Sequence, residues 1–150
     1  MRSGVRLGVD VGRVRIGVSR SDPDGMLALP VETVQRAEDG SDIARIQALV
    51  TEFGAVEAIV GLPLSLSGAH TASTDDAVEF ASRIATTCGI PVRLVDERLS
   101  TVSAQSALHA SGRTTRNSRS VVDQAAATVI LQHALDAERS SGRPPGELAT

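Results

Sequence analysis

The order of the strand-like and helix-like segments is the feature that most limits the fold of this chain. Three β-rich segments, 6–11, 16–20 and 27–34, follow one another at the start and are joined by turn-forming residues. Further along, strand-like segments at 58–60 and 92–95 alternate with segments whose apolar residues recur at helical spacing. A three-stranded antiparallel meander followed by two parallel strands predicts an α/β fold, in which helices cover both faces of a five-stranded mixed sheet.

N-capping residues and the helical spacing of apolar residues predict four helices. Ser41 is expected to cap the first, Ser73 the second in a capping box with Asp76, and Ser100 or Thr101 the third, while the fourth is expected to start near Ser120. The last helix is expected to end at Arg139, and residues 140–150, which are rich in Ser, Gly and Pro, resemble a disordered tail. We therefore expect residues 1–139 to form a single domain.

Composition excludes several functional classes. The chain of 150 residues is 41% hydrophobic and 22% charged, which is ordinary for a soluble protein. It contains no apolar run long enough for a membrane helix and does not open with a signal peptide, so we expect a cytoplasmic protein. Aromatic residues make up 1% of the chain, which argues against binding single strands mainly by base stacking. Because the net charge is −3, any binding of nucleic acid needs a local basic patch.

Cys88 is the only cysteine in the sequence, which excludes an internal disulfide and a cysteine-based zinc cluster. It lies on a helical stripe with Ala77, Ala81 and Ile84, and this position favours burial. Its place at the end of the helix, just before Gly89, leaves a second interpretation open, in which an exposed thiol links two chains of a homodimer.

Asp10 is an acid in an otherwise apolar, strand-like run, and an ionised carboxylate removed from water needs a partner. It lies at the carboxyl end of the first strand, where open α/β sheets bind ligands. The fifth strand ends in Asp96 and Glu97, and because side chains alternate along a strand, only one of them can point where Asp10 points. Asp123 lies on the apolar stripe of the last helix, in its expected first turn, where the helix dipole favours a carboxylate.

Three carboxylates gathered at one end of a sheet repel one another unless a divalent cation lies between them. Hard oxygen ligands suit Mg²⁺ or Mn²⁺, and two such ions are the usual arrangement for in-line cleavage of a phosphodiester. We therefore interpret Asp10, Glu97 and Asp123 as catalytic residues and metal ligands. Each also has a structural explanation: a turn for Asp10, an ion pair with Arg98 for Glu97, and a capping box with Ser120 for Asp123.

Two segments have the composition of contacts to a nucleic-acid substrate. The segment 61–68, rich in Gly and Ser, follows a strand and precedes a helix, where backbone N–H groups can receive phosphate. The segment 112–119 reads as a polar loop whose arginines suit a sugar–phosphate backbone. The alternatives are an ordinary strand–helix connection and a solvated loop. The residues assigned to substrate binding, from these segments and from the surroundings of the acids, are Arg13, Arg15, Ser65, Arg98, Arg113, Arg116 and Arg119.

Four motifs, in the same order and spacing, resemble the bacterial YqgF/RuvX family. They are GVDVGRVRIGV (Gly8–Val18), IVGLP (Ile59–Pro63), DERLST (Asp96–Thr101) and VDQAAA (Val122–Ala127), and the resemblance covers residues 5–136. It implies the ribonuclease H-like fold shared with RuvC resolvases, and a Mg²⁺- or Mn²⁺-dependent nuclease whose catalytic acids fall on Asp10, Glu97 and Asp123. The family is described both as a nuclease that matures the 5′ end of pre-16S ribosomal RNA and as a Holliday junction resolvase.

Two departures from the family pattern lie beside the expected site and bear on substrate contacts. They are Arg13-Val14-Arg15, where relatives often have a small residue followed by Lys, and Ser65-Leu66-Ser67, where Asn and a more polar run are common. Two other functions remain as alternatives. An actin-like ATPase also opens with a D-x-G phosphate loop before a hairpin, but it needs two related domains. A binding-only module would recognise branched nucleic acid through its arginines without cleaving it.

Overall fold

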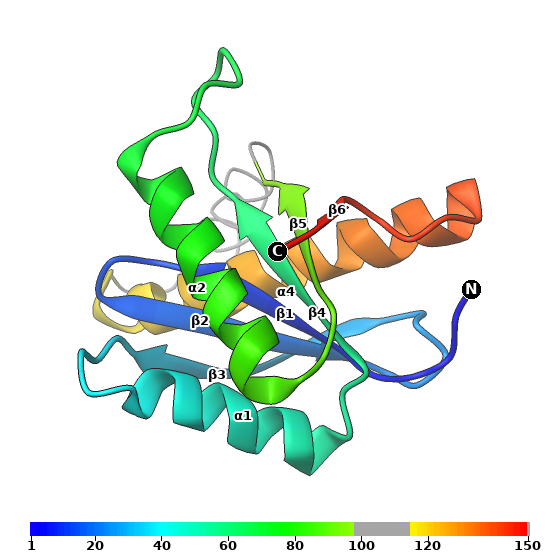
Figure 1. Ribbon diagram of the computed structural model, residues 1–150, viewed down its shortest axis with the longest axis horizontal. Helices are drawn as coiled ribbons and strands as arrows, with labels where there is room; N and C mark the ends of the chain where they lie inside the picture. The colour runs from blue at the N-terminus through cyan, green and yellow to red at the C-terminus, as the bar shows by residue number, and fades with distance from the viewer. Residues whose placement is uncertain (98–114, 150) are drawn as a thin grey trace.

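A six-stranded mixed sheet forms the centre of the protein (Figure 1). The computed structural model describes residues 1–97 and 115–149, with side chains from residue 121 onward in the second range. β1, β2 and β3 form an antiparallel meander, β1, β4 and β5 are parallel, and β6 is antiparallel to β5. The strands, in the spatial order β3-β2-β1-β4-β5-β6, are β1 (Arg6–Val11), β2 (Arg15–Ser21), β3 (Ala28–Gln35), β4 (Glu57–Leu62), β5 (Val92–Asp96) and β6 (Glu147–Leu148). The α/β fold and the mixed sheet are thus confirmed.

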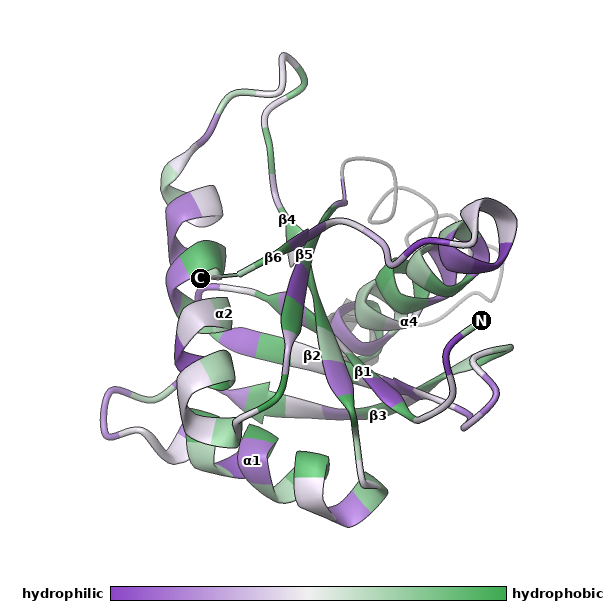
Figure 2. Cartoon of the chain, turned by 45° about the vertical axis from the view of Figure 1, so that its right-hand side comes forward, coloured by the Kyte–Doolittle hydropathy of each residue, from purple (hydrophilic) through white to green (hydrophobic). Residues whose placement is uncertain are grey.

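Helices cover both faces of this sheet, as Figures 1 and 2 show. α1 (Ser41–Phe53) and α2 (Ala72–Cys88) pack against each other on one face, whereas α4 (Thr115–Ser141) crosses β1, β2 and β3 on the other. The larger apolar core lies between the sheet and α1 and α2. A smaller one under α4 contains Ala28, Ile59, Ile130, Leu131, Ala134 and Leu135. Within the described residues, none of the helices combines the length and the apolar character that a membrane crossing needs.

Two glycines in the first hairpin allow α4 to lie directly on the backbone of the sheet. A Cβ atom on Gly8 would lie 2.7 Å from the Cβ of Leu131, and one on Gly17 would lie 1.8 Å from the carbonyl oxygen of Asp123. Between them, the hydroxyl of Ser19 donates a hydrogen bond of 2.8 Å to the carbonyl of Ala127. Because side chains at the glycine positions would push the helix away, their absence sets the distance between α4 and the hairpin.

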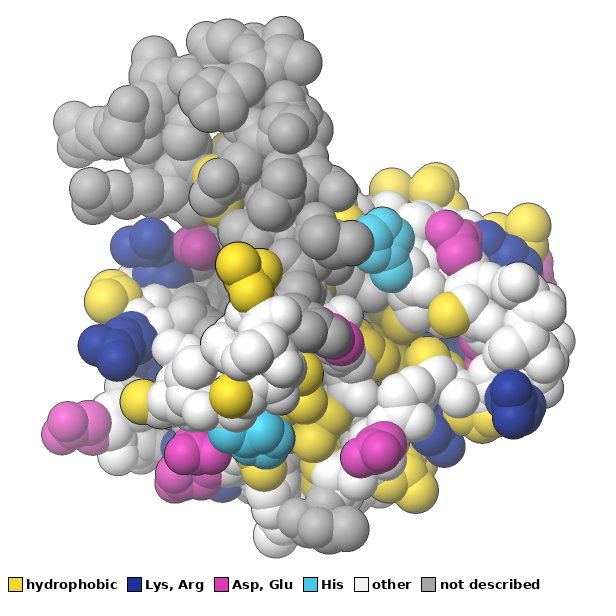
Figure 3. Space-filling view, turned by 90° about the horizontal axis from the view of Figure 1, so that it is seen from above, with side chains coloured by type: hydrophobic (Ala, Val, Ile, Leu, Met, Phe, Trp, Pro, Cys, Tyr) yellow, Lys and Arg dark blue, Asp and Glu magenta, His cyan; other side chains and the backbone are white. Residues whose placement is uncertain are grey.

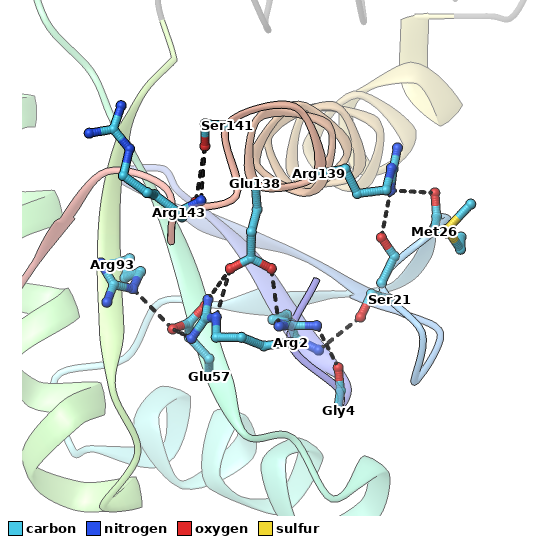
Figure 4. Close-up of polar contacts among 12 residues, drawn as sticks. Arg2, Gly4, Ser21, Met26, Glu57, Arg93, Glu138, Arg139, Ser141 and Arg143 are labelled. Atoms are coloured by element: carbon cyan, nitrogen blue, oxygen red, sulfur yellow. Dashed lines mark hydrogen bonds and ion pairs between the residues drawn. The ribbon is translucent and has the colours of Figure 1, made fainter.

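A buried cluster of charges joins the far end of α4 to the starts of β1 and β4 (Figure 4). Glu57 and Glu138 are 2% and 4% exposed, and Arg6 is 2% exposed. Arg2 contacts both acids: Nε lies 2.7 Å from Glu138, and Nη1 lies 3.0 Å from Glu57. Arg6 reaches Glu138 at 3.3 Å, and Arg93 of β5 reaches Glu57 at 3.0 Å. Each buried carboxylate therefore has two arginine partners, as burial of a charge requires.

The sheet has six strands rather than the five that we predicted from the sequence. The additional strand, β6, lies in the segment that we expected to be a disordered tail, and the backbone N–H of Ala149 donates to the carbonyl of Val92 at 2.8 Å. Without it, β5 would be an edge strand with unpaired backbone groups. A strand of two residues is too short to produce an alternating pattern, so composition alone indicated disorder for a segment that the sheet orders.

Three helix boundaries also differ from prediction. α2 is capped by Thr71, in a capping box with Thr74, and not by Ser73; α1 has Gly40 at its N-cap, so Ser41 is its first residue. α4 begins at Thr115 instead of Ser120 and continues to Ser141. The sequence did not indicate the earlier start, because the polar first turns carry no apolar periodicity. Gly54 and Gly89 end α1 and α2 as expected. The helix expected at Ser100 or Thr101 lies outside the described residues.

Replacement of Glu138 by Gln should lower the free energy of unfolding by about 3 kcal/mol, because the buried guanidinium of Arg6 loses the charge that compensates it. Urea denaturation followed by circular dichroism measures the change. As a matched control, Glu52→Gln on the exposed face of α1 should change stability by less than about 0.5 kcal/mol. Equal, small effects of both substitutions would show that the cluster contributes little to stability.

Candidate active site

Asp10 occupies β1 between two glycines of the neighbouring strands. It is paired with Gly17 of β2, and the register between β1 and β4 places Gly61 on its other side. Gly8, two residues earlier on the same face of β1, lies against Leu131 of α4. The half-buried carboxyl group of Asp10 therefore points to the face of the sheet that α4 covers.

The two flanking glycines leave room for the other two acids. A Cβ atom on Gly61 would lie 2.1 Å from Oε2 of Glu97, and one on Gly17 would lie 1.8 Å from the backbone oxygen of Asp123. Any side chain at either position would occupy space that these residues take up. The glycines thus bring Glu97, just after β5, and Asp123, on α4, next to Asp10. Neither glycine was assigned a role from the sequence, although a glycine within a strand commonly marks such a close approach.

Glu97 is the acid of the fifth strand that faces Asp10. Its backbone N–H donates to the carbonyl of Leu62 at 3.4 Å, which continues the pairing of β4 and β5 by one residue. The carboxyl groups of Glu97 and Asp10 are hydrogen-bonded to each other, whereas Asp96 is exposed. Oε2 of Glu97 is buried and has no hydrogen-bond partner among the described residues. Such an atom is costly to bury and calls for a ligand or a proton.

The contact between these acids changes how readily each one ionises. Burial raises the pKa of Glu97 to about 8, and the charge of Asp10 and the hydrogen bond to it add to the increase. Burial also raises the pKa of Asp10 to about 6, as does the charge of Asp123, while the hydrogen bond with Glu97 acts in the opposite direction. At neutral pH the pair therefore shares a proton that resides on Glu97, which donates it to the carboxylate of Asp10.

Asp123 joins this pair from α4, but its carboxylate is held by an arginine. Nε of Arg15 donates to Oδ2 of Asp123 at 2.8 Å, and the two side chains are 29% and 18% exposed. Asp123 is the ninth residue of α4 counted from Thr115, so the expected effect of a first-turn helix dipole on it is wrong. Packing of the helix on Gly17, not the helix end, positions this acid.

The three acids are neighbours without forming a closed cage. Among the described residues, no group of three acidic, histidine or cysteine side chains has the arrangement of a metal cluster. The donor chemistry nevertheless fits a hard divalent cation, since every candidate ligand atom is a carboxylate oxygen. A cation would also resolve two costs of the observed arrangement, the partnerless oxygen of Glu97 and the proton forced between two carboxyl groups.

The residues assigned to substrate binding have different positions. Arg13 is exposed in the turn between β1 and β2. The hydroxyl of Ser65 accepts a hydrogen bond of 3.1 Å from the backbone N–H of Ala69, so it holds the loop between β4 and α2 in shape. Arg98 and Arg113 lie outside the described residues. Arg116 and Arg119 belong to the first turns of α4 rather than to a loop, and their side chains are not described.

Arg36 lies near the site and was not assigned a role from the sequence. Its guanidinium donates to the carbonyl of Gly12 at 3.0 Å and pairs with Asp76 of α2 at 2.8 Å. It also stacks over the ring of Phe80 at 5.0 Å from the ring centre. Arg36 therefore anchors the turn that carries Arg13 and Arg15 to the helix layer. An isolated arginine at the end of a strand gave no signal for this contact.

The surface over this end of the sheet carries both signs of charge. Figure 3 views the molecule from the end at which the β4–α2 loop projects, and basic and acidic side chains alternate over the described part of this face. The described residues show no continuous basic strip here. A predicted strip of Arg113, Arg116 and Arg119 therefore stays a prediction.

Cys88 lies half-buried at the last position of α2. Burial raises the pKa of its thiol, so the reactive thiolate is disfavoured. Its side chain packs against the larger apolar core, as the helical stripe predicted, and a link between two chains through this thiol stays a prediction.

The fold resembles that of RuvC. Superposition on a structure of T. thermophilus RuvC in complex with a Holliday junction substrate gives a TM-score of 0.56 at 17% sequence identity. The match covers 97% of this chain and 99% of the RuvC chain. A second structure of T. thermophilus RuvC gives a TM-score of 0.53 at 18% identity, over 91% and 97% of the two chains. The protein thus has the ribonuclease H-like fold that the sequence motifs implied.

Sequence comparison narrows this class to one family. A family model described as "RuvX: Holliday junction resolvase" matches residues 4–137. A relative from Leifsonia xyli subsp. xyli, named "Putative pre-16S rRNA nuclease", is 68% identical over 146 residues, which cover 97% of this chain and 94% of the relative. A protein of the same name from Streptomyces coelicolor is 51% identical over 148 residues, covering 98% and 89% of the two chains. The chain belongs to the RuvX family, and it is a nuclease.

The shared proton predicts a pH dependence of stability for the metal-free protein. The carboxyl pKa of Glu97 is raised above its ordinary value in the folded state, so between about pH 5 and pH 8 the folded chain binds more protons than the unfolded one. Stability in EDTA should therefore fall as the pH rises through this range. Thermal unfolding of the wild type should show the decline, and Glu97→Gln, which cannot ionise, should show a flatter profile. Parallel profiles for both proteins would contradict the assignment of the proton.

Proposed function

We propose that this protein is a Mg²⁺- or Mn²⁺-dependent endonuclease that matures the 5′ end of pre-16S ribosomal RNA. The observation that carries the proposal is the contact between Asp10 and Glu97, in which one buried carboxylate oxygen lacks a partner among the described residues. It lies where β1 and β5 end, the position at which open α/β sheets bind ligands. A nuclease with such a carboxylate site needs positive charge there to act on a phosphodiester.

Asp10, Glu97 and Asp123 would hold the metal. When bound, a divalent cation would supply positive charge to stabilise the attacking and leaving oxygens of an in-line displacement. The chain's own contribution is to present carboxylate oxygens: Asp10 from a rigid strand, Glu97 after loss of its proton, and Asp123 from a helix packed on glycine. Burial disfavours the charged form of Glu97, so ionisation of this carboxyl group is costly without a metal. Binding of a cation would lower that cost.

The RNA substrate is favoured by the names of the relatives, which cover nearly the whole chain. A four-way DNA junction is the second candidate, because the family model is described as a Holliday junction resolvase. Both substrates present the same phosphodiester backbone, so the carboxylate site does not distinguish them. We place the action of the protein in the cytoplasm, where ribosomal RNA precursors are processed.

Cleavage tests this proposal directly. Incubation with a 5′-extended pre-16S rRNA fragment and Mn²⁺ should give a discrete product, and Asp10→Asn should reduce the rate by at least about a hundredfold while folding normally. Asp123→Asn should have the same effect, and Ca²⁺ should support binding but little turnover. Near-normal cleavage by either variant would contradict the site. Cleavage of a four-way junction but not of the RNA would favour the resolvase function, and binding without scission would favour a binding-only module.

The two adjacent acids after β5 provide a matched pair of variants. Glu97→Gln should reduce cleavage as severely as Asp10→Asn, because it removes a ligand charge at the site. Asp96→Asn should retain cleavage within a few-fold of the wild type, because the Asp96 side chain is exposed. The same single-turnover assay measures both, and circular dichroism confirms folding. The reverse ranking would show that the acid facing Asp10 has been misassigned.

A further inference from the structure

Arg15 is the basic residue that contacts the acidic site in the described part of the chain. Its Nε donates to Oδ2 of Asp123 at 2.8 Å, and its side chain is 29% exposed. The contact joins two elements whose separation is already set, because Gly17, two residues further along the same face of β2, lies under Asp123. The ion pair is therefore built into the packing of α4 on the hairpin.

The contact uses only one edge of the guanidinium. The two terminal nitrogens of Arg15, which carry four of its five N–H donors, make no hydrogen bond to the described residues. These nitrogens form the planar fork that binds a phosphate through two hydrogen bonds. The side chain is partly exposed, so a movement of its flexible stem away from Asp123 would bring this fork to a substrate.

Under the proposed function, Arg15 and the metal make competing demands on Asp123. A divalent cation bound to this carboxylate would lie next to the guanidinium, and two like charges at that separation repel each other strongly. Asp123 belongs to a helix packed tightly on Gly17, whereas Arg15 has a flexible stem that is partly exposed. Of the two, Arg15 is the group able to move.

We propose that Arg15 is the counter-ion of Asp123 in the metal-free protein and transfers to a phosphate of the substrate when the metal binds. This inference rests on the proposed function. It assigns Arg15 two partners in sequence: the carboxylate before metal binding, and the phosphodiester backbone afterwards. Arg15 thereby couples occupation of the metal site to substrate binding. A surface arginine, in contrast, attracts nucleic acid whether or not the metal is bound.

Metal affinity gives the first test, without any need for catalysis. Binding of Mn²⁺ is measured by electron paramagnetic resonance of the free ion, for the wild type, Arg15→Gln and Arg15→Lys. Arg15→Gln should bind Mn²⁺ roughly tenfold more tightly, because the competing charge is gone, and Arg15→Lys should stay close to the wild type. Arg45→Gln is the matched control, since Arg45 pairs with Glu32 on the opposite layer and should leave Mn²⁺ affinity unchanged. Unchanged or weaker Mn²⁺ binding by Arg15→Gln would overturn the inference.

Substrate affinity gives the second test. Binding of a fluorescent four-way DNA junction, and of the RNA fragment, is measured by anisotropy in Ca²⁺ and in EDTA. Arg15→Gln should weaken binding about tenfold in Ca²⁺ and less than about twofold in EDTA, where Arg15 is still held by Asp123. Equal weakening in both conditions would show that Arg15 contacts nucleic acid independently of the metal and would overturn the inference.

A third variant keeps the test decisive if Arg15→Gln does not fold. Asp123→Asn releases Arg15 without any metal, so it should bind the junction more tightly than the wild type in EDTA. That gain should be largely absent in the double variant Arg15→Gln/Asp123→Asn; its full persistence would contradict the inference. Failure of the wild type to bind Mn²⁺ in a manner that depends on Asp10 would remove the proposed function and this inference together. Normal Mn²⁺ binding with no effect of Arg15→Gln would remove the inference alone.

Discussion

Contact of α4 with the bare backbone of the first hairpin is the constraint on which the rest of the structure depends. Gly8 and Gly17 lack the side chains that would hold the helix off, so its backbone rests on β1 and β2. The same contact places Asp123 over the strand beside Asp10. It also brings Nε of Arg15 to 2.8 Å from the carboxylate of Asp123. The packing of α4 and the geometry of the site therefore depend on each other. A shift of the helix on the sheet would change the relative positions of Asp10, Asp123 and Arg15.

The two ends of α4 handle charge in opposite ways. At its far end, Glu138 is nearly fully buried, and two arginines compensate it. Near its start, the acids outnumber the single basic partner in the described residues, and Glu97 retains a proton because burial, and then the charge of Asp10, raise its pKa. A helix held by compensated charges at one end can carry an excess of acids at the other, since the cost at the site is offset by packing elsewhere.

Several features of the fold and site could be read from residues close in sequence. The three consecutive strand-like segments, followed by alternating strands and helices, predicted the mixed sheet. The apolar stripes of α1 and α2 were recognised because burial of one helix face imposes a 3.6-residue spacing. Asp10 stood out since an acid in an apolar strand needs a reason. β6 and the first turns of α4 were missed because a two-residue strand and a polar helical segment carry no periodicity.

The sequence by itself determined the kinds of group available: carboxylates at the ends of two strands, a third on the apolar face of a helix, and the motifs that mark the family. Only the tertiary structure decided the contacts through which they meet. It placed Glu97, the acid that the family resemblance favours over Asp96, next to Asp10; it showed that Asp123 owes its position to Gly17 and not to a helix end, and it turned Arg15 toward an acid. These choices depend on contacts between strands and a helix more than a hundred residues apart, as for Arg15 and Asp123, and local propensity and spacing carry no record of which distant backbone will lie against a glycine.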